Sequence, residues 1–239
     1  MVDNPITSHG RRGPVMASTP IPRWKFAFDW LWMVLILPLT LVLTSLLFCW
    51  VKLASPGPFI FRQTRIGRDG KPFTMYKART MQPGADPAIH EAHILQLVRS
   101  NRPLTKLDSR DGRLIKGARV IRMLGLDELP QLVNVLRGDM SVVGPRPCIP
   151  SEFQLYDAHH HRRFAVRPGL TGLWQIQRTE ATTFSEMAGM DLEYVDRLSA
   201  WSDCKIIMKT PLSMIKHILT SVRSAGRKPR AWRSGQSSV

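Results

Sequence analysis

An uncharged run of 22 consecutive residues, from Trp30 to Val51, constrains the fold of this chain more than any other feature. As a straight helix the run would be about 33 Å long, close to the roughly 30 Å thickness of a bilayer's hydrocarbon core. It is longer than the apolar region of a usual secretory signal, and no Ala-x-Ala cleavage site follows it. The sequence therefore predicts a membrane helix over residues 23–53 that stays on the protein.

Pro38 falls close to the middle of this run. A proline inside a helix removes one backbone hydrogen bond and clashes with the preceding turn, so we expect a kink there. A mildly bent helix would cross the bilayer, as the long aliphatic run favours. A sharply broken one would return to the same face, as the basic residues on both flanks (Arg23, Lys25 and Lys52) favour. The residues alone leave both topologies open.

The charge balance indicates anionic partners. The chain has 34 Lys and Arg against 18 Asp and Glu, and no acidic residue follows Asp203. Such an excess suits nucleic acid, an anionic lipid surface or phosphorylated substrates. Residues 1–22, rich in Pro, Ser and Thr, are expected to form a flexible basic tail, and residues 223–239 a basic C-terminal tail. The three cysteines are widely separated and fit free thiols in a reducing compartment.

Residues 54–222 are expected to form one α-rich α+β domain. Two apolar segments, 59–61 and 73–76, flank a glycine-containing loop at 67–70 and predict a β-hairpin. Apolar periodicity and helix-start signals predict several amphipathic helices. The predicted helices cover 86–99, 150–164, 184–200 and 206–222.

Two adjacent carboxylates, Asp127 and Glu128, precede an apolar helical pattern. Pro130 is tolerated only in the first turn of a helix, so the pair is expected at a helix N-terminus, where the macrodipole favours anions. There the two carboxylates could hold a divalent metal ion, and one of them could attack phosphorus. Alternatively, Asp127 is an N-cap and Glu128 a first-turn acid, both with purely structural roles.

Basic residues gather at turn-forming positions, several of them held by proline. They include Arg62 and Arg65, Lys77 and Arg79, Arg146 in Gly-Pro-Arg-Pro, and Arg167 in Arg-Pro-Gly. Arg122 lies in an amphipathic segment just ahead of the carboxylate pair. Guanidinium groups bind phosphate in a bidentate manner, and proline reduces the entropy lost on fixing them. The alternative is that these residues are surface charges or partners of the acidic side chains.

Seven blocks in a fixed order carry a family resemblance. They are residues 55–63, 65–73, 76–81, 126–131, 138–147, 167–175 and 191–195. Over about residues 23 to 219 the chain resembles the bacterial sugar transferase family, the monotopic polyprenyl-phosphate glycosyl-1-phosphate transferases, in their small, minimal form. The resemblance implies a reaction that moves a sugar-1-phosphate from a UDP-sugar to a polyprenyl phosphate, releases UMP, and begins the assembly of a polysaccharide or glycoconjugate.

The resemblance also assigns roles to residues. Asp127 would be the nucleophile that takes the phosphosugar, and Glu128 would help to hold Mg²⁺. The substrate-binding candidates are Arg62, Lys77, Arg79, Arg122, Arg146 and Arg167. The supporting candidates are Pro38, Pro145, Pro147, Asp191 and Asp203.

The resemblance further implies a location. In the family the entry helix is a re-entrant helix-break-helix with a proline at the break, which is the place of Pro38. This reverses the preference for a spanning helix and puts the catalytic domain on the cytoplasmic face of the bacterial inner membrane. We expect no nucleic-acid partner, and a homodimer is compatible with the resemblance.

Three departures from the family pattern stand out. Gly125 occupies the position that is usually Ser or Thr, 77–81 reads Lys-Ala-Arg-Thr-Met in place of Lys-Phe-Arg-Ser-Met, and 177–180 replaces the common Ser-Gly-Arg-Asn. The last departure leaves the donor sugar undetermined. A second hypothesis, from a different functional class, is a membrane-anchored basic module that binds anionic lipid or nucleic acid. Dependence on a metal ion would separate the enzyme from such a module.

Overall fold

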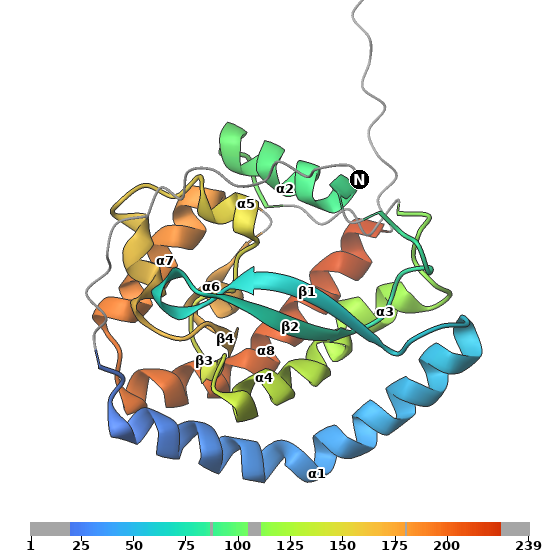
Figure 1. Cartoon of the computed structure of the whole chain (residues 1–239), viewed down its shortest axis with the longest axis horizontal. Helices are drawn as coiled ribbons and strands as arrows, with labels where there is room; N and C mark the ends of the chain where they lie inside the picture. The colour runs from blue at the N-terminus through green and yellow to red at the C-terminus, as the bar shows by residue number, and fades with distance from the viewer. Residues whose placement is uncertain (1–19, 87, 105–110, 180, 226–239) are drawn as a thin grey trace, which may run out of the picture.

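The computed structural model describes residues 20–86, 88–104, 111–179 and 181–225, and it has the predicted α-rich α+β architecture (Figure 1). The elements in chain order are α1 (Arg23–Ala54), β1 (Ile60–Ile66), η1 (Arg68–Gly70), β2 (Pro72–Ala78), α2 (Ala88–Ser100), α3 (Ala118–Met123), η3 (Leu126–Gln131), α4 (Leu132–Arg137), β3 (Ser141–Val143), α5 (Pro150–Phe153), η4 (His160–Ala165), β4 (Gly169–Thr171), α6 (Leu173–Gln177), α7 (Phe184–Asp196) and α8 (Ala200–Ala225). The two predicted tails lie largely outside the described residues.

Helix α1 contains the apolar run and is the one described helix long and apolar enough to cross a membrane. It continues through Pro38 from Arg23 to Ala54, and it bends along its length in Figure 1. The bend fits the kink predicted for Pro38. Most of its apolar side chains, such as Leu31 and Val34, are exposed. A helix with this much exposed apolar surface is suited to contact with lipid.

The N-terminal half of α1 is attached to the domain by buried polar contacts. Lys25 forms an ion pair with Asp203 at the start of α8 and donates to the Val143 carbonyl oxygen at 2.9 Å. Asp29 accepts from the Ser141 hydroxyl at 2.8 Å and from the Val142 N–H at 3.0 Å. Asp203, predicted as a supporting residue, therefore helps to anchor α1.

The C-terminal half of α1 is attached to the same domain by apolar packing. Leu47 and Val51 are buried with Ala78 of β2, with Ala118 at the start of α3 and with Ile115 just before it. Both halves of the helix therefore contact one folded domain, and the two ends do not extend away from it on opposite sides.

The predicted hairpin is confirmed as an antiparallel pair of strands, β1 and β2, in which Ile60 pairs with Ala78 and Ile66 with Pro72. Asp69 and Gly70 adopt positive φ angles of 57° and 70° in the connecting turn. The buried side chain of Asn134 then fastens α4 to β2. Its Oδ1 accepts from the Tyr76 N–H at 3.1 Å, and its Nδ2 donates to the Thr74 carbonyl at 2.7 Å.

A second, parallel pair of short strands, β3 and β4, was not predicted. It brings together two proline-containing loops, 144–147 and 167–169, because Gly169 N–H donates to the Pro145 carbonyl at 2.9 Å. The loops are so close that a Cβ on Gly144 would lie 2.3 Å from the Arg167 carbonyl oxygen. Glycine is therefore required at position 144 by close backbone approach.

The predicted helices are confirmed with one exception. Residues 86–99, 184–200 and 206–222 correspond to α2, α7 and α8. The segment 150–164 is not one helix but two short elements, α5 and η4, separated by residues 154–159. The interruption lets Phe153, Tyr156 and Phe164 pack into one buried aromatic cluster.

Candidate active site

The two adjacent carboxylates lie at the N-terminal end of a helical segment, as the sequence predicts. Asp127 and Glu128 are in the first turn of η3, which leads directly into α4. The N-cap is Gly125, in the left-handed conformation with φ of 67°, so Asp127 does not occupy the capping position. Glycine adopts this conformation without the strain that a side chain would cause. Asp127 is buried, whereas the side chain of Glu128 is 46% exposed.

Lys77 on β2 reaches this pair. Its Nζ lies 3.0 Å from Glu128 Oε1, and both side chains remain partly exposed. Because side chains alternate along a strand, every second residue of each strand lies on the same face of the hairpin as Lys77. These residues are Phe61, Gln63 and Arg65 on β1, which pair with Lys77, Met75 and Phe73 on β2.

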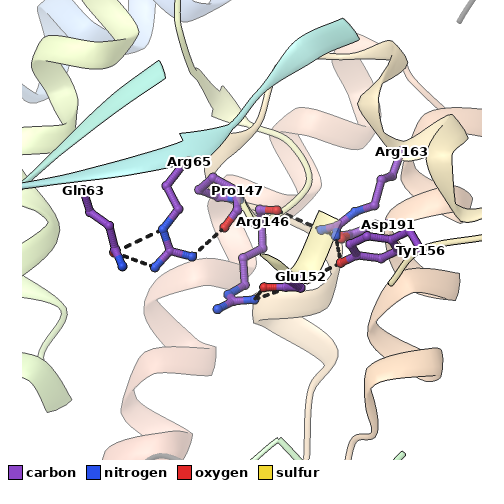
Figure 2. Close-up of polar contacts among 8 residues, drawn as sticks. All are labelled: Gln63, Arg65, Arg146, Pro147, Glu152, Tyr156, Arg163 and Asp191. Carbon is purple, nitrogen blue, oxygen red and sulfur yellow. Dashed lines mark hydrogen bonds and ion pairs between the residues drawn. The ribbon is translucent and has the colours of Figure 1, made fainter. Parts of the chain in front are cut away.

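Arg65 is the buried cation on that face. Its Nη1 donates to the Pro147 carbonyl at 3.2 Å, and its Nη2 donates to Gln63 Oε1 at 2.8 Å (Figure 2). Burial, together with the nearby charge of Arg146, lowers the pKa of Arg65 to about 10, so it stays charged at neutral pH. The negative charges of Glu152 and, to a smaller extent, Glu128 act in the opposite direction, which indicates that Arg65 lies within electrostatic reach of Glu128.

Arg146 lies between the two prolines of the 144–147 loop, whose position is fixed on both sides. Pro145 accepts from the 167–169 loop, and Pro147 accepts from Arg65. The Arg146 guanidinium lies 5.9 Å from the centre of the Trp174 ring and makes long contacts of 3.4 Å and 3.5 Å with Glu152. Pro145 and Pro147 therefore hold the loop that presents Arg146.

A buried polar network supports this loop from behind (Figure 2). Arg163 donates to the Arg146 carbonyl at 2.8 Å and pairs with Asp191 on α7. Tyr156 links the two halves of the network, since it accepts from Arg163 and donates to Glu152 Oε1 at 2.9 Å. Burial raises the pKa of Asp191 to about 6, although Arg163 opposes that rise. Asp191 thus supports the Arg146 loop through Arg163.

Arg178 is a further cation on this side of the domain, just after α6. Its guanidinium lies 5.1 Å from the centre of the Trp174 ring, so Trp174 is contacted by both Arg146 and Arg178. Burial lowers the pKa of Arg178; Glu128 opposes the shift and Arg146 adds to it. Its Nε is buried and has no hydrogen-bond partner among the described residues. This nitrogen could donate to a bound ligand.

The sequence places Arg65 among the basic residues at turns but not among the substrate-binding candidates, and it does not single out Arg178 for the site. The signal for Arg65 was available, because Arg65 and Lys77 share one face of the predicted hairpin. Arg178 had no such signal, since it lies in the segment that departs from the family pattern. Lys77 contacts Glu128, and the charges of Glu128 and Arg146 both act on Arg65 and Arg178; we call these four cations the arginine cluster (Arg65, Lys77, Arg146 and Arg178).

Two predicted substrate-binding residues, Arg62 and Arg79, lie elsewhere. Arg62 pairs with Tyr76, so its side chain lies on the face of the hairpin opposite to the face that carries Lys77. Arg79 is buried and donates to the Pro58 carbonyl at 2.7 Å and to the Ser55 carbonyl at 2.9 Å, which holds the turn after α1. Arg122 lies in the last turn of α3.

Arg167 is also outside the arginine cluster. Its guanidinium lies 4.4 Å from the centre of the Phe26 ring on α1. The two proline-held arginines, Arg146 and Arg167, therefore serve different parts of the molecule.

The donors for a metal ion are few. Among the described residues, no group of three or more His, Cys, Asp or Glu side chains could hold a metal ion. Mg²⁺, however, commonly uses one or two carboxylates and completes its shell with substrate phosphate and water. Asp127 and the partly exposed Glu128 therefore fit a Mg²⁺ ion that arrives with a phosphorylated substrate. Adjacent cations also fit a diphosphate, whose oxygens accept charge-assisted hydrogen bonds.

Comparisons with known proteins identify the relatives of this chain. Residues 22–217 match the family described as bacterial sugar transferase. The chain is 42% identical over 155 residues to the galactosyl transferase CpsE of Streptococcus agalactiae, a match that covers 64% of this chain and 34% of CpsE. It is 38% identical over 174 residues to the UDP-glucose:undecaprenyl-phosphate glucose-1-phosphate transferase of Caulobacter vibrioides, covering 69% of this chain and 60% of that protein. It is also 38% identical over 197 residues to the exopolysaccharide production protein ExoY of Sinorhizobium fredii, covering 78% of this chain and 83% of ExoY.

Proposed function

Because the chain belongs to the bacterial sugar transferase family, we propose that it transfers a sugar-1-phosphate from a UDP-sugar to undecaprenyl phosphate and releases UMP. The names of its relatives point to glucose or galactose as the sugar and to exopolysaccharide or capsule assembly as the purpose. The reaction would take place on the cytoplasmic face of the bacterial inner membrane.

One observation carries the proposal above the others. Asp127 and Glu128 stand side by side at the start of η3, with Lys77 in contact with Glu128 and Arg65 and Arg178 within its electrostatic reach. A nucleotide diphosphate is strongly anionic, and phosphoryl transfer requires both neutralisation of that charge and in-line positioning. The arginine cluster would provide the first, and the rigid loop that carries Arg146 would contribute to the second.

In the proposed mechanism Asp127 acts as nucleophile. A carboxylate oxygen of Asp127 attacks the phosphorus that carries the sugar, the bond from that phosphorus to the bridging oxygen breaks, and UMP leaves with that oxygen. An oxygen of the lipid phosphate then attacks the same phosphorus and displaces the Asp127 carboxylate. The sugar-1-phosphate has then been transferred to the lipid as a diphosphate, and the Asp127 carboxylate is regenerated.

Glu128 and Asp127 would together hold Mg²⁺. When bound, the ion would neutralise diphosphate charge that the arginine cluster leaves uncompensated. Lys77 would keep the Glu128 carboxylate oriented, because its ammonium group already pairs with Oε1 at 3.0 Å.

We further propose that α1 enters and leaves the membrane on the same face. The attachment of both halves of α1 to one domain supports this topology, since a spanning helix would separate its ends by the thickness of the bilayer. A reporter active only outside the cytoplasm, fused at the N-terminus, should be inactive while the enzyme retains UMP release. An active reporter on a functional enzyme would favour a spanning helix.

The decisive experiment for the reaction measures UMP released from a panel of UDP-sugars by membranes that contain the protein and undecaprenyl phosphate. Asp127→Asn should reduce turnover by about 10³-fold or more, as expected when a nucleophile is removed. A matched control is Asp196→Asn, which changes an exposed aspartate that pairs with Arg162 and should retain activity. Normal turnover by Asp127→Asn would refute the assignment of the nucleophile.

Chelation separates the enzyme from the alternative of a basic binding module. EDTA should stop UMP release, and added Mg²⁺ should restore it. A purely electrostatic binder would respond to salt and be indifferent to EDTA. Glu128→Gln should raise the Mg²⁺ concentration that gives half-maximal activity, because one of the two proposed metal-binding carboxylates is lost.

A further inference from the structure

A pocket of about 230 Å³ lies between α1, the C-terminal end of α4 and Arg167. From α1 it is lined by aromatic side chains, Phe26 and Trp30, and from α4 by residues that include Arg137. Neither Asp127 nor Glu128 lines it, and it shares no residue with the arginine cluster. The pocket is therefore distinct from the candidate active site.

Arg167 is the central cation of this pocket. It lies against the Phe26 ring and next to Gly138, where a Cβ would come within 3.4 Å of Arg167 Nη2. Burial lowers the pKa of Arg167, so its charge is partly removed from water. Within the described part of the chain its guanidinium makes no hydrogen bond or ion pair. A partly desolvated, unpaired guanidinium is stabilised by an anion that accepts its hydrogen bonds.

The residues that line the pocket carry a net positive charge, which favours the binding of an anion. Arg137 adds a second positive charge, and its Nη1 donates to the Tyr76 hydroxyl at 2.6 Å. Asp29 is the one acid in the lining; its Oδ1 accepts from Ser141 and Val142 and lies 3.8 Å from Lys25, whereas its Oδ2 has no hydrogen-bond partner among the described residues and its charge acts on Arg167. The pocket consequently has an excess of one positive charge.

The pocket is also continuous with the apolar surface of α1. Phe26 and Trp30 are 41% and 56% exposed, and the exposed Leu31 and Val34 follow them along the helix. Aromatic residues at the start of a membrane segment typically lie at the level of the lipid headgroups. An occupant could therefore place a polar head against Arg167 and its apolar chains along α1.

We propose that this pocket binds one anionic glycerophospholipid, with the phosphodiester against Arg167 and Arg137 and the acyl chains against Phe26 and Trp30. A single phosphodiester charge matches the excess charge of the lining. A zwitterionic headgroup would bring an additional cation next to two arginines. The acceptor, undecaprenyl phosphate, has to reach Asp127, and the pocket contains no residue of η3.

The test uses the full-length protein, purified in detergent and stripped of lipid, and counts bound phosphatidylglycerol by native mass spectrometry. The wild type should retain one molecule with a saturable dissociation constant, and Arg167→Gln should weaken binding by about tenfold, the expected effect of losing a charge-assisted hydrogen bond. Arg137→Gln should act in the same direction. Unchanged thermal unfolding of each lipid-free variant would show that it is folded.

Lys52→Gln is the matched control. Lys52 is a cation at the other end of the same helix and also lies over an aromatic ring, 5.8 Å from the centre of Phe48, but it does not line the pocket. The Lys52→Gln variant should retain phosphatidylglycerol to within about twofold of the wild type, because it loses the same charge at a position outside the pocket.

Competition decides the nature of the occupant. Phosphatidylcholine and inorganic phosphate should displace phosphatidylglycerol poorly, since one lacks net charge and the other lacks acyl chains. Equal binding of phosphatidylcholine, or an equal loss in Lys52→Gln, would overturn the proposal in favour of non-specific lipid contact. Tighter, Arg167-dependent binding of undecaprenyl phosphate would overturn it by assigning the pocket to the acceptor. None of these measurements depends on UMP release, so the proposed reaction can fail or stand separately.

Discussion

The loops 144–147 and 167–169 look alike in the sequence but differ in the structure. Each places an arginine beside proline, and the two loops are joined by the short β3–β4 pair. Arg146 extends towards Glu152 and Trp174, with its carbonyl held by the buried Arg163. Arg167 instead lies against the Phe26 ring of the apolar helix α1.

The difference shows that proline fixes the backbone of each arginine, whereas the neighbouring side chains determine the role of the arginine. The Arg146 loop has a fully buried network behind it, comprising Glu152, Arg163 and Asp191. Arg167 has only an aromatic ring and a partly closed pocket. We therefore expect the Arg146 loop to be rigid and to position its arginine, and the Arg167 loop to depend on a ligand bound in the adjacent pocket.

Arg163→Met should have the largest effect on stability. It leaves Asp191 buried without its partner, and loss of one member of a buried ion pair typically costs about 3–5 kcal/mol. Arg162→Gln is the control at the adjacent position, because Arg162 forms an exposed pair with Asp196 worth about 1 kcal/mol or less. Denaturant unfolding in detergent measures both variants. Equal losses in the two would show that the network does not hold the Arg146 loop.

Arg146→Gln should act on catalysis. If Arg146 stabilises developing phosphate charge, its loss should reduce kcat/KM for UMP release by about 10²–10³-fold. The buried network keeps its Arg163–Asp191 pair but loses the long contacts between Arg146 and the buried Glu152, so the free energy of unfolding should fall by less than in Arg163→Met. A large loss of stability with unchanged kcat/KM would reverse the roles assigned to Arg146 and Arg163.

Gly144→Ala should disturb both loops together. The added Cβ would lie 2.3 Å from the Arg167 carbonyl and 2.8 Å from the Gly169 nitrogen, so the backbone must shift, at a cost of about 1–3 kcal/mol or more. Turnover and retention of phosphatidylglycerol should then fall in the same variant. Gly189→Ala on α7 is the control, since a Cβ there meets nothing within 4 Å and alanine is favoured in a helix. Retention of one property with loss of the other would show that the loops are independent.

Local patterns predicted the parts of this contrast that depend on nearby residues. The apolar run predicts α1, the glycine-containing loop predicts the hairpin, and Pro130 places the carboxylate pair in a first turn. The seven blocks identified the family, and the comparison with its sequence profile confirmed that identification. These features are encoded within short stretches of chain.

Long-range pairing could not be predicted in the same way. The β3–β4 pair joins segments that lie 28 residues apart in register, Ser141 with Gly169, and each strand has three residues, too few for a periodic pattern. Arg62 and Arg79 carry the same charge as Arg65, and only strand register and burial separate their positions. Charge and spacing select a group of cations, whereas the tertiary fold decides which of them face Glu128.

The smallest predicted effect is a dependence of the unfolding free energy on pH that arises from Asp191, in the buried network behind the Arg146 loop. Burial holds the pKa of Asp191 near 6, above its ordinary value of 3.8, so the folded protein binds a proton there that the unfolded chain releases. The stability contributed by that proton is complete below about pH 4 and is lost as the pH rises through 6. In Asp191→Asn this part of the dependence of the unfolding free energy on pH should disappear, whereas the contributions of the other titratable groups should remain. Urea unfolding of both proteins between pH 4 and 7 measures the difference, and parallel curves would show that Asp191 remains ionised because Arg163 compensates fully for its burial. Binding of phosphatidylglycerol at Arg167 should be indifferent to this titration, because no carboxylate of the buried network lines that pocket.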